Sequence, residues 1–347
     1  MSLVDAVLTK ALRTTPLHHL QLAYQGRVQR VGLKLEEHGA TGSIKDRTAV
    51  GLLRALHEER PLAPGTVVVE STSGNLGLAM ANLLAAMDCS FIAVVDLKTP
   101  LTTRRTLEAS GARVVVVDEP DGQGGYLLSR LRTVRRLCER HPEYRWPDQY
   151  ANPASPAVHR ATTGPELTEQ AGPDLSAVYV PVSTGGTFAG VAAHLRTHRP
   201  DVTPVAVDLR GSLALGGAAG RRLIPGIGAS RPSVFLPAPH THRSVHVDDV
   251  EAMAVCRILA EDLGHELGGS SGCVLAALLA DMAQGRLDPG LPVCLAADGG
   301  RKYRDTVFSD TWASRHDILT DLTRAMGRLR RDGLRFSIRQ YQEHHTP

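Results

Sequence analysis

The chain has 347 residues, 42% of them hydrophobic, and is therefore long enough to bury two sizeable cores around one site. Its 39 basic and 36 acidic residues nearly balance, at a net charge of +3, which gives no reason to expect nucleic acid or a membrane as a partner. No stretch approaches the roughly 18 apolar residues of a membrane span, and the start of the chain lacks a basic segment followed by an apolar run. We therefore expect neither export nor membrane anchoring.

The cysteines and histidines give no metal pattern. There are five cysteines, an odd number, without C-x-x-C or metal-ligand spacing, which favours a reducing cytoplasm. His194 and His198 are four residues apart, but they lie near a helix C-terminus, where positive charge is favoured, and no third ligand is close in sequence. We expect no bound metal.

From Gly65 onward, short apolar runs alternate with helical stretches. Continuous β-branched runs between helices indicate strands that a parallel sheet buries on both faces. The predicted strands are 66–70, 90–95, 113–117, 177–181, 202–209 and 292–296, and the predicted helices are 75–87, 100–110, 125–140, 187–197, 250–263 and 271–282. This alternation predicts an α/β protein built from βαβ units.

The chain is predicted to divide into two lobes and an extension. Residues 143–153 are rich in proline and polar residues, so they are expected to form the hinge. A smaller α/β lobe is expected at 35–145, and a larger one from 1–34 and 146–315. Residues 316–347 have the apolar spacing of an amphipathic helix with arginines on its other face, which indicates a solvated or dimer-contact surface.

Lys45 is one of five lysines, and it alone lies in a Gly-Ser-x-Lys motif that opens a helix. Ser43 can cap this helix, and Asp46 suits its first turn. A desolvated lysine loses its proton more easily, and only the neutral amine attacks a carbonyl. Taken alone, the motif fits an ordinary surface lysine about as well.

Two further loops are rich in glycine and hydroxyl groups, and each follows an apolar run and opens a helix. The loop from Ser71 to Gly77 lies where a parallel sheet presents ligands, and its N–H and hydroxyl groups suit a carboxylate. The loop from Ser183 to Thr187 suits a phosphate. Each loop by itself is a common turn of α/β proteins, but together with Lys45 they predict a pyridoxal-phosphate site.

The order and spacing of Lys45, Asn75, the Thr184–Thr187 loop and the Gly268–Gly272 loop resemble the β-family (fold type II) of pyridoxal-phosphate enzymes, which cysteine synthase typifies. The resemblance runs from about Thr15 to Thr306. It implies two lobes of twisted, mostly parallel sheets flanked by helices, as in tryptophan synthase β. It also implies a cytoplasmic homodimer whose smaller lobe binds substrate and moves, and whose larger lobe binds pyridoxal 5'-phosphate.

The resemblance assigns roles to individual residues. Lys45 would form the imine with the cofactor and shuttle the proton, and Asn75 would bond the ring hydroxyl. Ser270 would face the pyridine nitrogen, and a neutral residue there favours loss of a β-substituent over chemistry that demands a stronger electron sink. The phosphate cup would be Ser183, Thr184, Gly185, Gly186 and Thr187. The substrate would be held by Ser71, Thr72, Ser73, Gln149 and Tyr150.

The implied reaction is β-replacement on an activated L-serine through an aminoacrylate. Leu76, Tyr150 and Ser183 depart from plain cysteine synthase, and Leu223–Ser230 resembles the branch of the family that serves 2,3-diaminopropionate biosynthesis. That branch joins O-phospho-L-serine to L-glutamate, giving N-(2-amino-2-carboxyethyl)-L-glutamate. The hydroxyls of Tyr150 and Ser183 are expected to hold the glutamate; in the competing interpretation the phenol packs on the hinge and Ser183 caps a helix.

Other functions stay open at the level of sequence. The nucleophile could be sulfide, with O-acetylserine or O-phosphoserine as donor, as in a cysteine synthase. A non-catalytic homologue that binds an amino acid or phosphate is a second alternative, against which the intact lysine argues. A nicotinamide-dependent enzyme is disfavoured because no G-x-G-x-x-G motif follows a strand. One departure concerns Gly300-Arg301-Lys302-Tyr303, which stands where the family shows Gly-Glu-Arg-Tyr.

Overall fold

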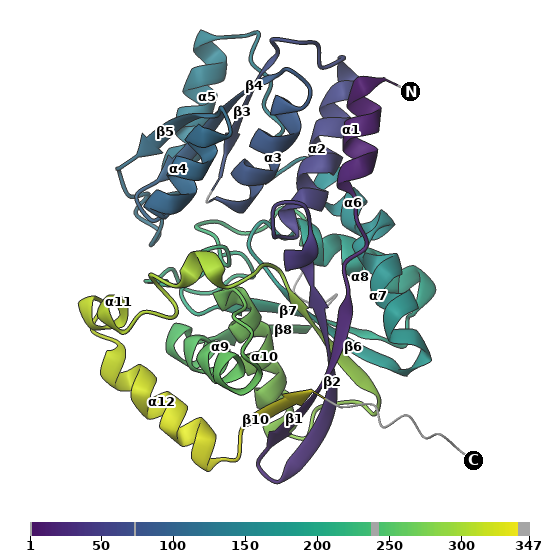
Figure 1. Ribbon diagram of the computed structural model, residues 1–347, viewed down its shortest axis with the longest axis vertical. Helices are drawn as coiled ribbons and strands as arrows, with labels where there is room; N and C mark the ends of the chain where they lie inside the picture. Colours follow the sequence, from purple (N-terminus) through teal and green to yellow (C-terminus); the bar gives the residue numbers. More distant parts are fainter. Residues whose placement is uncertain (1, 73, 237–242, 339–347) are drawn as a thin grey trace.

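The computed structural model describes residues 2–72, 74–236 and 243–338, and its strands form two sheets (Figure 1). The smaller sheet has three strands in the order β3-β4-β5, and the larger has seven in the order β10-β1-β2-β9-β6-β7-β8. In the view of Figure 1 the smaller sheet and its helices lie at the top and the larger sheet lies below. Among the described residues, no helix has the length and apolar character needed to cross a membrane.

Three consecutive βα units build the smaller sheet, and both of its strand pairs are parallel. Its strands are β3 (Val67–Ser71), β4 (Ser90–Asp96) and β5 (Arg113–Val117), and the helices that follow them are α3 (Asn75–Ala85), α4 (Leu101–Ala109) and α5 (Leu127–Arg140). The predicted strands and helices of this region are thus confirmed. The apolar runs of β3 and β4 are buried between helices, whereas β5, at an edge of the sheet, is partly exposed.

Two N-terminal helices, α1 (Leu3–Ala11) and α2 (Lys45–Glu59), pack against the smaller sheet's core. Leu8 of α1 and Leu53 of α2 are both fully buried there. The sequence interpretation grouped residues 1–34 with the larger lobe, whereas α1 lies on the smaller one. The division into two moving lobes stays a prediction.

Parallel pairing dominates the larger sheet, from β2 through β9, β6 and β7 to β8, while β1 pairs antiparallel with β2 and with β10. Its strands are β1 (Leu17–Tyr24), β2 (Arg27–Leu35), β6 (Leu175–Pro181), β7 (Thr203–Leu209), β8 (Arg243–Val247), β9 (Leu291–Ala296) and β10 (Arg335–Ile338). The prediction found β6, β7 and β9. It missed the β1–β2 hairpin, β8 and β10.

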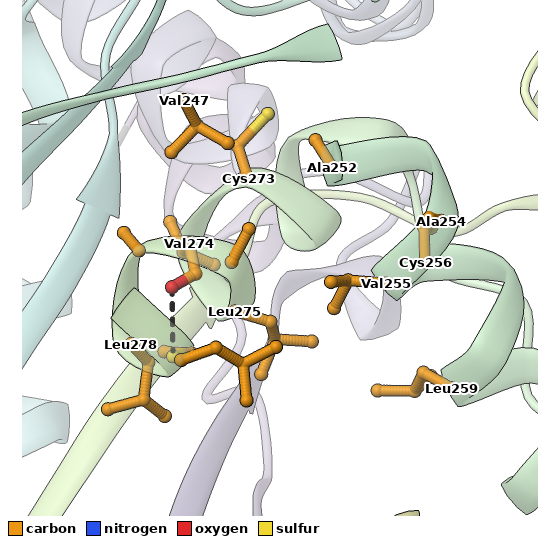
Figure 2. Close-up of a cluster of buried hydrophobic side chains, with 14 of the residues drawn as sticks. Val247, Ala252, Ala254, Val255, Cys256, Leu259, Cys273, Val274, Leu275 and Leu278 are labelled. Atoms are coloured by element: carbon orange, nitrogen blue, oxygen red, sulfur yellow. Dashed lines mark hydrogen bonds between the residues drawn. The ribbon is translucent and has the colours of Figure 1, made fainter. Parts of the chain in front are cut away.

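Helices cover both faces of the larger sheet. Alternate residues of β6 show this: Val178 and Val180 pack with Phe188 of α8, whereas Tyr179 packs in the core that contains α9 and α10. Figure 2 shows the latter core, in which the Cys256 and Cys273 thiols lie among aliphatic side chains. The helices are α6 (Ala154–Ala161), α7 (Thr163–Ala171), α8 (Gly186–His198), α9 (Asp249–Leu263), α10 (Gly269–Ala283), α11 (Asp310–Arg315) and α12 (Leu319–Arg331), with short 3-10 turns at η1 (Glu36–His38), η2 (Gly172–Asp174) and η4 (Arg301–Tyr303).

The C-terminal helix α12 packs on α9 through Leu322 and Leu329, which are both buried. Two of the arginines on its basic face pair with acids of α9: Arg328 with Glu251, and Arg330 with Glu261 at 2.7 Å. These arginines therefore serve an intramolecular contact in addition to facing solvent. The last nine residues of the predicted extension, 339–347, lie outside the described part of the chain.

Candidate active site

Lys45 lies at the first turn of α2, where the chain passes from the larger sheet to the smaller one. Ser43 accepts a hydrogen bond from the Lys45 backbone N–H at 3.3 Å, and the Ile44 N–H donates to the carbonyl of Ala297, just past β9, at 2.9 Å. Burial lowers the pKa of the Lys45 ammonium; the nearby Asp298 opposes this shift and Lys302 adds to it. The pocket environment therefore favours the neutral amine that reacts with carbonyls.

The predicted phosphate loop lies in the same pocket as Lys45. The pocket is lined by residues of α2, of the turn between β6 and α8, and of a loop around Gly226. Among its lining residues are Lys45, Ser183, Thr184, Gly185 and Thr187. Residues about 140 positions apart in the sequence thus surround one cavity, as the β-family resemblance predicted.

The turn into α8 fits a phosphate group. Gly185 has a φ of +91°, a conformation that favours glycine, and a Cβ there would collide with Ser233. A Cβ on Gly186 would collide with the Ser155 hydroxyl, whose oxygen is buried with no hydrogen-bond partner among the described residues. Bare backbone at the start of a 13-residue helix, beside an unpaired hydroxyl, is what an anion requires.

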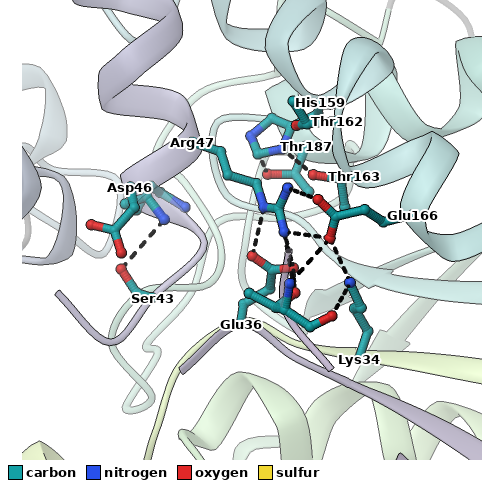
Figure 3. A network of polar contacts seen from close by, with 12 residues as sticks. Lys34, Glu36, Ser43, Asp46, Arg47, His159, Thr162, Thr163, Glu166 and Thr187 are labelled. Carbon is teal, nitrogen blue, oxygen red and sulfur yellow. Dashed lines mark hydrogen bonds and ion pairs between the residues drawn. The ribbon is translucent and has the colours of Figure 1, made fainter. Parts of the chain in front are cut away.

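His159 fixes the phosphate loop to the helix that carries Lys45. Its Nε2 lies 3.0 Å from the Thr48 hydroxyl on α2 and 3.2 Å from the Thr187 hydroxyl on α8, and its Nδ1 lies 2.9 Å from Thr163 on α7 (Figure 3). The imidazole is fully buried, and burial holds its pKa well below the usual value. A neutral histidine therefore connects three hydroxyls beside the pocket.

Next to His159, a buried ion network joins α2 to β2 and α7. Arg47 on α2 donates to Glu36 at 2.8 Å and to Glu166 at 2.6 Å, and Glu166 also accepts from the fully buried Lys34 at 2.7 Å (Figure 3). Two cations and two carboxylates balance each other, so the charges remain paired out of water. The network anchors the helix whose first residue is Lys45.

Asn75, predicted to bond the cofactor ring, contacts the larger lobe through its side-chain amide. Its Nδ2 donates to Asp298 at 2.7 Å, and its Oδ1 accepts from Lys302. Tyr303 also donates to the same Asp298 oxygen at 2.6 Å, and Lys302 lies 3.0 Å from it. The motif that departs from the family pattern, residues 300–303, therefore holds Asn75 directly.

Ser270 lies in the first turn of α10 and is buried. The preceding Gly268 donates its N–H to the Asp298 carbonyl at 2.9 Å, so this helix start adjoins the Asn75 contact. Asp298 thus adjoins both Asn75 and the start of the helix that carries Ser270. Their contacts with a cofactor stay predictions.

The predicted substrate loop follows β3. The Thr72 hydroxyl already accepts two backbone hydrogen bonds, from the N–H groups of Gly74 and Gly77, both at 3.0 Å. Gln149 donates to the Ser71 carbonyl at 2.6 Å, while the buried Ser71 hydroxyl lacks a partner among the residues described. Ser73, the remaining member of this group, lies outside the described residues.

A carboxylate missed in the sequence, Glu70, holds the hinge to this loop. It accepts hydrogen bonds from the backbone N–H of Ser71 at 2.7 Å, from that of Gln149 at 3.0 Å and from the Trp146 indole at 3.3 Å. Burial raises the pKa of Glu70 to about 8. The hinge and the substrate loop are thus joined through one buried side chain.

Tyr150 and Ser183 line a wide cavity between the two sheets. Its empty volume is about 1210 Å³, including space open to solvent, and Ser183 and Gly226 belong both to it and to the Lys45 pocket. The Ser183 hydroxyl donates to the Gly228 carbonyl at 3.0 Å. The Tyr150 ring is buried beneath the guanidinium of Arg231, 5.5 Å from the ring centroid.

Arg130 is a second residue that sequence reasoning missed. It lies on α5, lines the same cavity and is only 5% exposed. Its Nε is 3.2 Å from Asp96, and its Nη1 is buried with no hydrogen-bond partner in the described part of the chain. A single arginine on a helix gives no signal in the sequence, because its importance depends on the cavity that the fold places beside it.

Comparisons with known proteins agree with this geometry. Residues 8–299 match the family described as pyridoxal-phosphate dependent enzyme. The chain belongs to this family. The family, the α/β fold class and the cofactor predicted from the sequence are therefore confirmed.

Two curated members are similar over most of their length. Both are N-(2-amino-2-carboxyethyl)-L-glutamate synthases. The one from Ralstonia nicotianae is 38% identical over 87% of this chain and 89% of its own, and the one from Cupriavidus metallidurans is 34% identical over 88% and 90%.

Two solved structures share the fold. O-ureido-L-serine synthase has 27% sequence identity, with a TM-score of 0.78 over 89% of this chain and 98% of its own. An O-acetylserine dependent cystathionine beta-synthase from Helicobacter pylori has 26% identity, with a TM-score of 0.77 over 86% and 97%. The two-lobed arrangement seen here is therefore that of solved enzymes that form or use serine derivatives, as their names state.

Proposed function

We propose that the protein catalyses β-replacement on O-phospho-L-serine with L-glutamate, giving N-(2-amino-2-carboxyethyl)-L-glutamate and phosphate. The Cβ–O bond of phosphoserine breaks, a bond from Cβ to the glutamate nitrogen forms, and the nitrogen gives up a proton. The names of the two curated relatives support this reaction. The product is a precursor suited to 2,3-diaminopropionate biosynthesis.

Bound pyridoxal phosphate would withdraw electrons from the Cα of the amino acid and so acidify its α-proton. The protein's own contribution is placement. Lys45 would hold the cofactor and move the α-proton at its Nζ, and its lowered pKa suits both tasks. The phosphate would lie on residues 183–187, and Asn75 and Ser270 would bond the ring.

Residues 71–73 and Gln149 would bind the carboxylate of the amino-acid substrate. The unpaired Ser71 hydroxyl supports this role, because a buried hydroxyl without a partner costs free energy that a bound carboxylate would recover. Thr72 would act chiefly by holding the loop, since two backbone N–H groups already use its oxygen.

The observation that carries the choice of donor is Arg130. A buried guanidinium with unmet donors beside the Lys45 pocket suits an anionic leaving group such as phosphate. The acetyl group of O-acetylserine carries no charge and would leave the unpaired Nη1 of Arg130 without an anionic acceptor. The geometry therefore supports O-phospho-L-serine over O-acetylserine.

A cysteine synthase reaction, with sulfide as the nucleophile, is the competing function. The test is to incubate the cofactor-loaded protein with phosphoserine or O-acetylserine and a panel of acceptors that includes glutamate and sulfide, and to weigh the products. We expect the mass of N-(2-amino-2-carboxyethyl)-L-glutamate from phosphoserine and glutamate. Product from sulfide alone would show a cysteine synthase, and turnover of neither donor would show a non-catalytic binding homologue.

We further propose that the protein works in the cytoplasm as a homodimer on small-molecule substrates. All five cysteines carry free thiols, which suits a reducing compartment. Sedimentation of the purified protein tests the dimer.

A further inference from the structure

Part of the lining of the wide cavity comes from residues outside the predicted site. On the smaller lobe the cavity is lined by the β4–α4 connection, which carries Lys98, and on the larger lobe by Trp312 and His316 at α11. In Figure 1 α4 and α11 lie on the same side of the molecule.

The cavity has an excess of positive charge. Three cations line it, Lys98, Arg130 and Arg222, against one carboxylate, Asp96. Asp96 lies beside Arg130, and the guanidinium of Arg222 donates to the Ala229 and Gly211 carbonyls and to the Ser230 hydroxyl. Lys98 is thus the exposed cation of this lining, whereas Arg130 and Arg222 are buried.

The contacts of Lys98 hold its ammonium at the cavity without neutralising it. Its backbone N–H donates to Asp96 at 2.8 Å, which fixes the turn. Its Nζ lies 3.2 Å from the Gly124 carbonyl and 3.4 Å from the Arg222 carbonyl. An ammonium has three N–H donors, so one remains for a ligand. The carboxylates of Asp96, Asp121 and Asp249 favour its charge from nearby and Arg222 opposes it, but no ion pair to Lys98 is found among the described residues.

Also lining the cavity, Trp312 and His316 form a stacked pair, with ring centroids 4.1 Å apart. The His316 Nδ1 lies 2.9 Å from the Trp312 carbonyl, and since a carbonyl can only accept, Nδ1 carries the proton. In the neutral ring Nε2 is then an acceptor, which suits an amine N–H. The indole offers an apolar surface to methylene groups.

We propose that the space between Lys98 and the Trp312–His316 pair is the binding site of the second substrate, and that it selects an amino acid with a side-chain carboxylate. Lys98 pairs with that carboxylate, the aromatic pair covers the methylenes, and Nε2 of His316 receives the amine. A sulfide nucleophile would gain nothing from any of these groups. The inference rests on the proposed function, since it concerns the glutamate half of that reaction.

The test compares the cofactor-loaded parent with Lys98→Gln, Lys98→Arg and His316→Leu. Lys10→Gln, which removes an exposed lysine of α1, is the matched control. Three quantities are measured: phosphate released from phosphoserine in a single turnover without acceptor, the KM for glutamate, and the rate with sulfide.

Lys98→Gln is expected to raise the KM for glutamate roughly ten- to a hundredfold, because one charge-assisted hydrogen bond is lost. Lys98→Arg keeps the positive charge and should therefore have a KM for glutamate close to that of the parent. His316→Leu is expected to raise the same KM. Phosphate release and sulfide use should change by less than about twofold, because a purely acceptor-binding role leaves the donor half-reaction intact.

Two outcomes overturn the inference in different ways. If the parent uses glutamate, the inference fails where Lys98→Gln and His316→Leu both keep the parent's KM for it, or where the variants lose sulfide use as much as glutamate use. In either case the acceptor site lies elsewhere and the proposed function stands. A parent that transfers to sulfide but to no dicarboxylic amino acid overturns the proposed function together with the acceptor site.

Discussion

Lys45 depends on residues that are distant in the sequence. The turn before it is tied to Ala297 after β9, and the charges nearest its amine belong to Asp298 and Lys302. A lysine between one anion and one cation gains little net charge stabilisation, so burial decides its protonation. The local Gly-Ser-x-Lys motif supplies the position of the amine, and the end of β9 supplies its environment.

Replacing this amine gives the most direct prediction. Lys45→Ala is expected to abolish turnover and the lysine-linked yellow colour, because no other side chain of the pocket can form the bond to the cofactor. Borohydride reduction of the parent followed by peptide mapping should label Lys45. Label on Lys34 or Lys302 instead would disprove the assignment, and Lys10→Ala, at an exposed position, serves as the control.

Tyr150 and Ser183 are predicted to differ in their effect on glutamate. The Ser183 proton is already donated to Gly228, whereas the phenol of Tyr150, a residue that lines the cavity, donates to no partner within the described part of the chain. Tyr150→Phe should weaken glutamate use about ten- to a hundredfold, by roughly 1.5 to 3 kcal/mol for one charge-assisted hydrogen bond. Ser183→Gly should have a smaller effect.

In each variant, phosphate release from phosphoserine is measured separately from product formation with glutamate and with sulfide. Equal glutamate use by Tyr150→Phe and the parent would mean that the phenol only packs on the hinge.

At the scale of secondary-structure elements, the pocket is held by a junction of four helices. α2 carries Lys45, Arg47 and Thr48, and α8 carries Thr187, while α6 and α7 lie between them with His159 and Glu166. The helices contact each other through paired polar groups (Figure 3). Breaking one such contact leaves its partners buried and unsatisfied, so we expect the junction to be rigid.

His159→Leu is predicted to destabilise the fold by about 1 to 3 kcal/mol and to weaken cofactor binding, because the hydroxyls of Thr48, Thr163 and Thr187 lose their shared partner. The effect should depend on pH. Burial lowers the pKa of His159, so the unfolded chain takes up the proton first, and the parent loses stability as pH falls below the ordinary value of about 6.5.

The leucine variant lacks this ionisation and should lose less stability over the same range. Urea unfolding at several pH values measures both effects, with His198→Leu, an exposed site, as the control. Identical pH profiles for the parent and His159→Leu would contradict a neutral buried imidazole.

At the scale of the whole molecule, the site lies between two sheets that share few direct bonds across the cavity. The Asn75–Asp298 contact and the Glu70 contacts to the hinge are among the links. Such an arrangement suits closure, in which a bound ligand adds the missing contacts and excludes water.

We predict that a substrate carboxylate bound by residues 71–73 and Gln149 draws the smaller lobe, roughly residues 35–145, toward the larger one. The approach of the lobes would also bring Lys98 toward α11. Crystal structures with and without a bound amino acid measure the rotation. Structures that superpose over both sheets at once would refute the closure.

Much of the fold follows from local patterns. The β-branched runs of β3, β4, β6, β7 and β9 are largely buried, and this explains why their alternation with helices was readable. The edge strand β5 is partly exposed, and its run of four valines made it readable. The β1–β2 hairpin was missed because β1 has polar residues such as His18, His19 and Gln21 along its length. The short β10 is a strand because β1 offers an edge, which no pattern within Arg335–Ile338 reveals.

The sequence by itself determined the chemistry of the loops. Lys45, Asn75 and the Ser183–Thr187 turn each lie at the start of a helix that follows a strand. Asn75 follows a strand of the smaller sheet and the other two follow strands of the larger one, so their meeting was predicted from the resemblance to the family. Only the tertiary structure decided what surrounds them. Arg130, Lys98 and His316 line one cavity although they come from distant parts of the chain. Helical or strand periodicity specifies which face of an element is buried but not which element covers it.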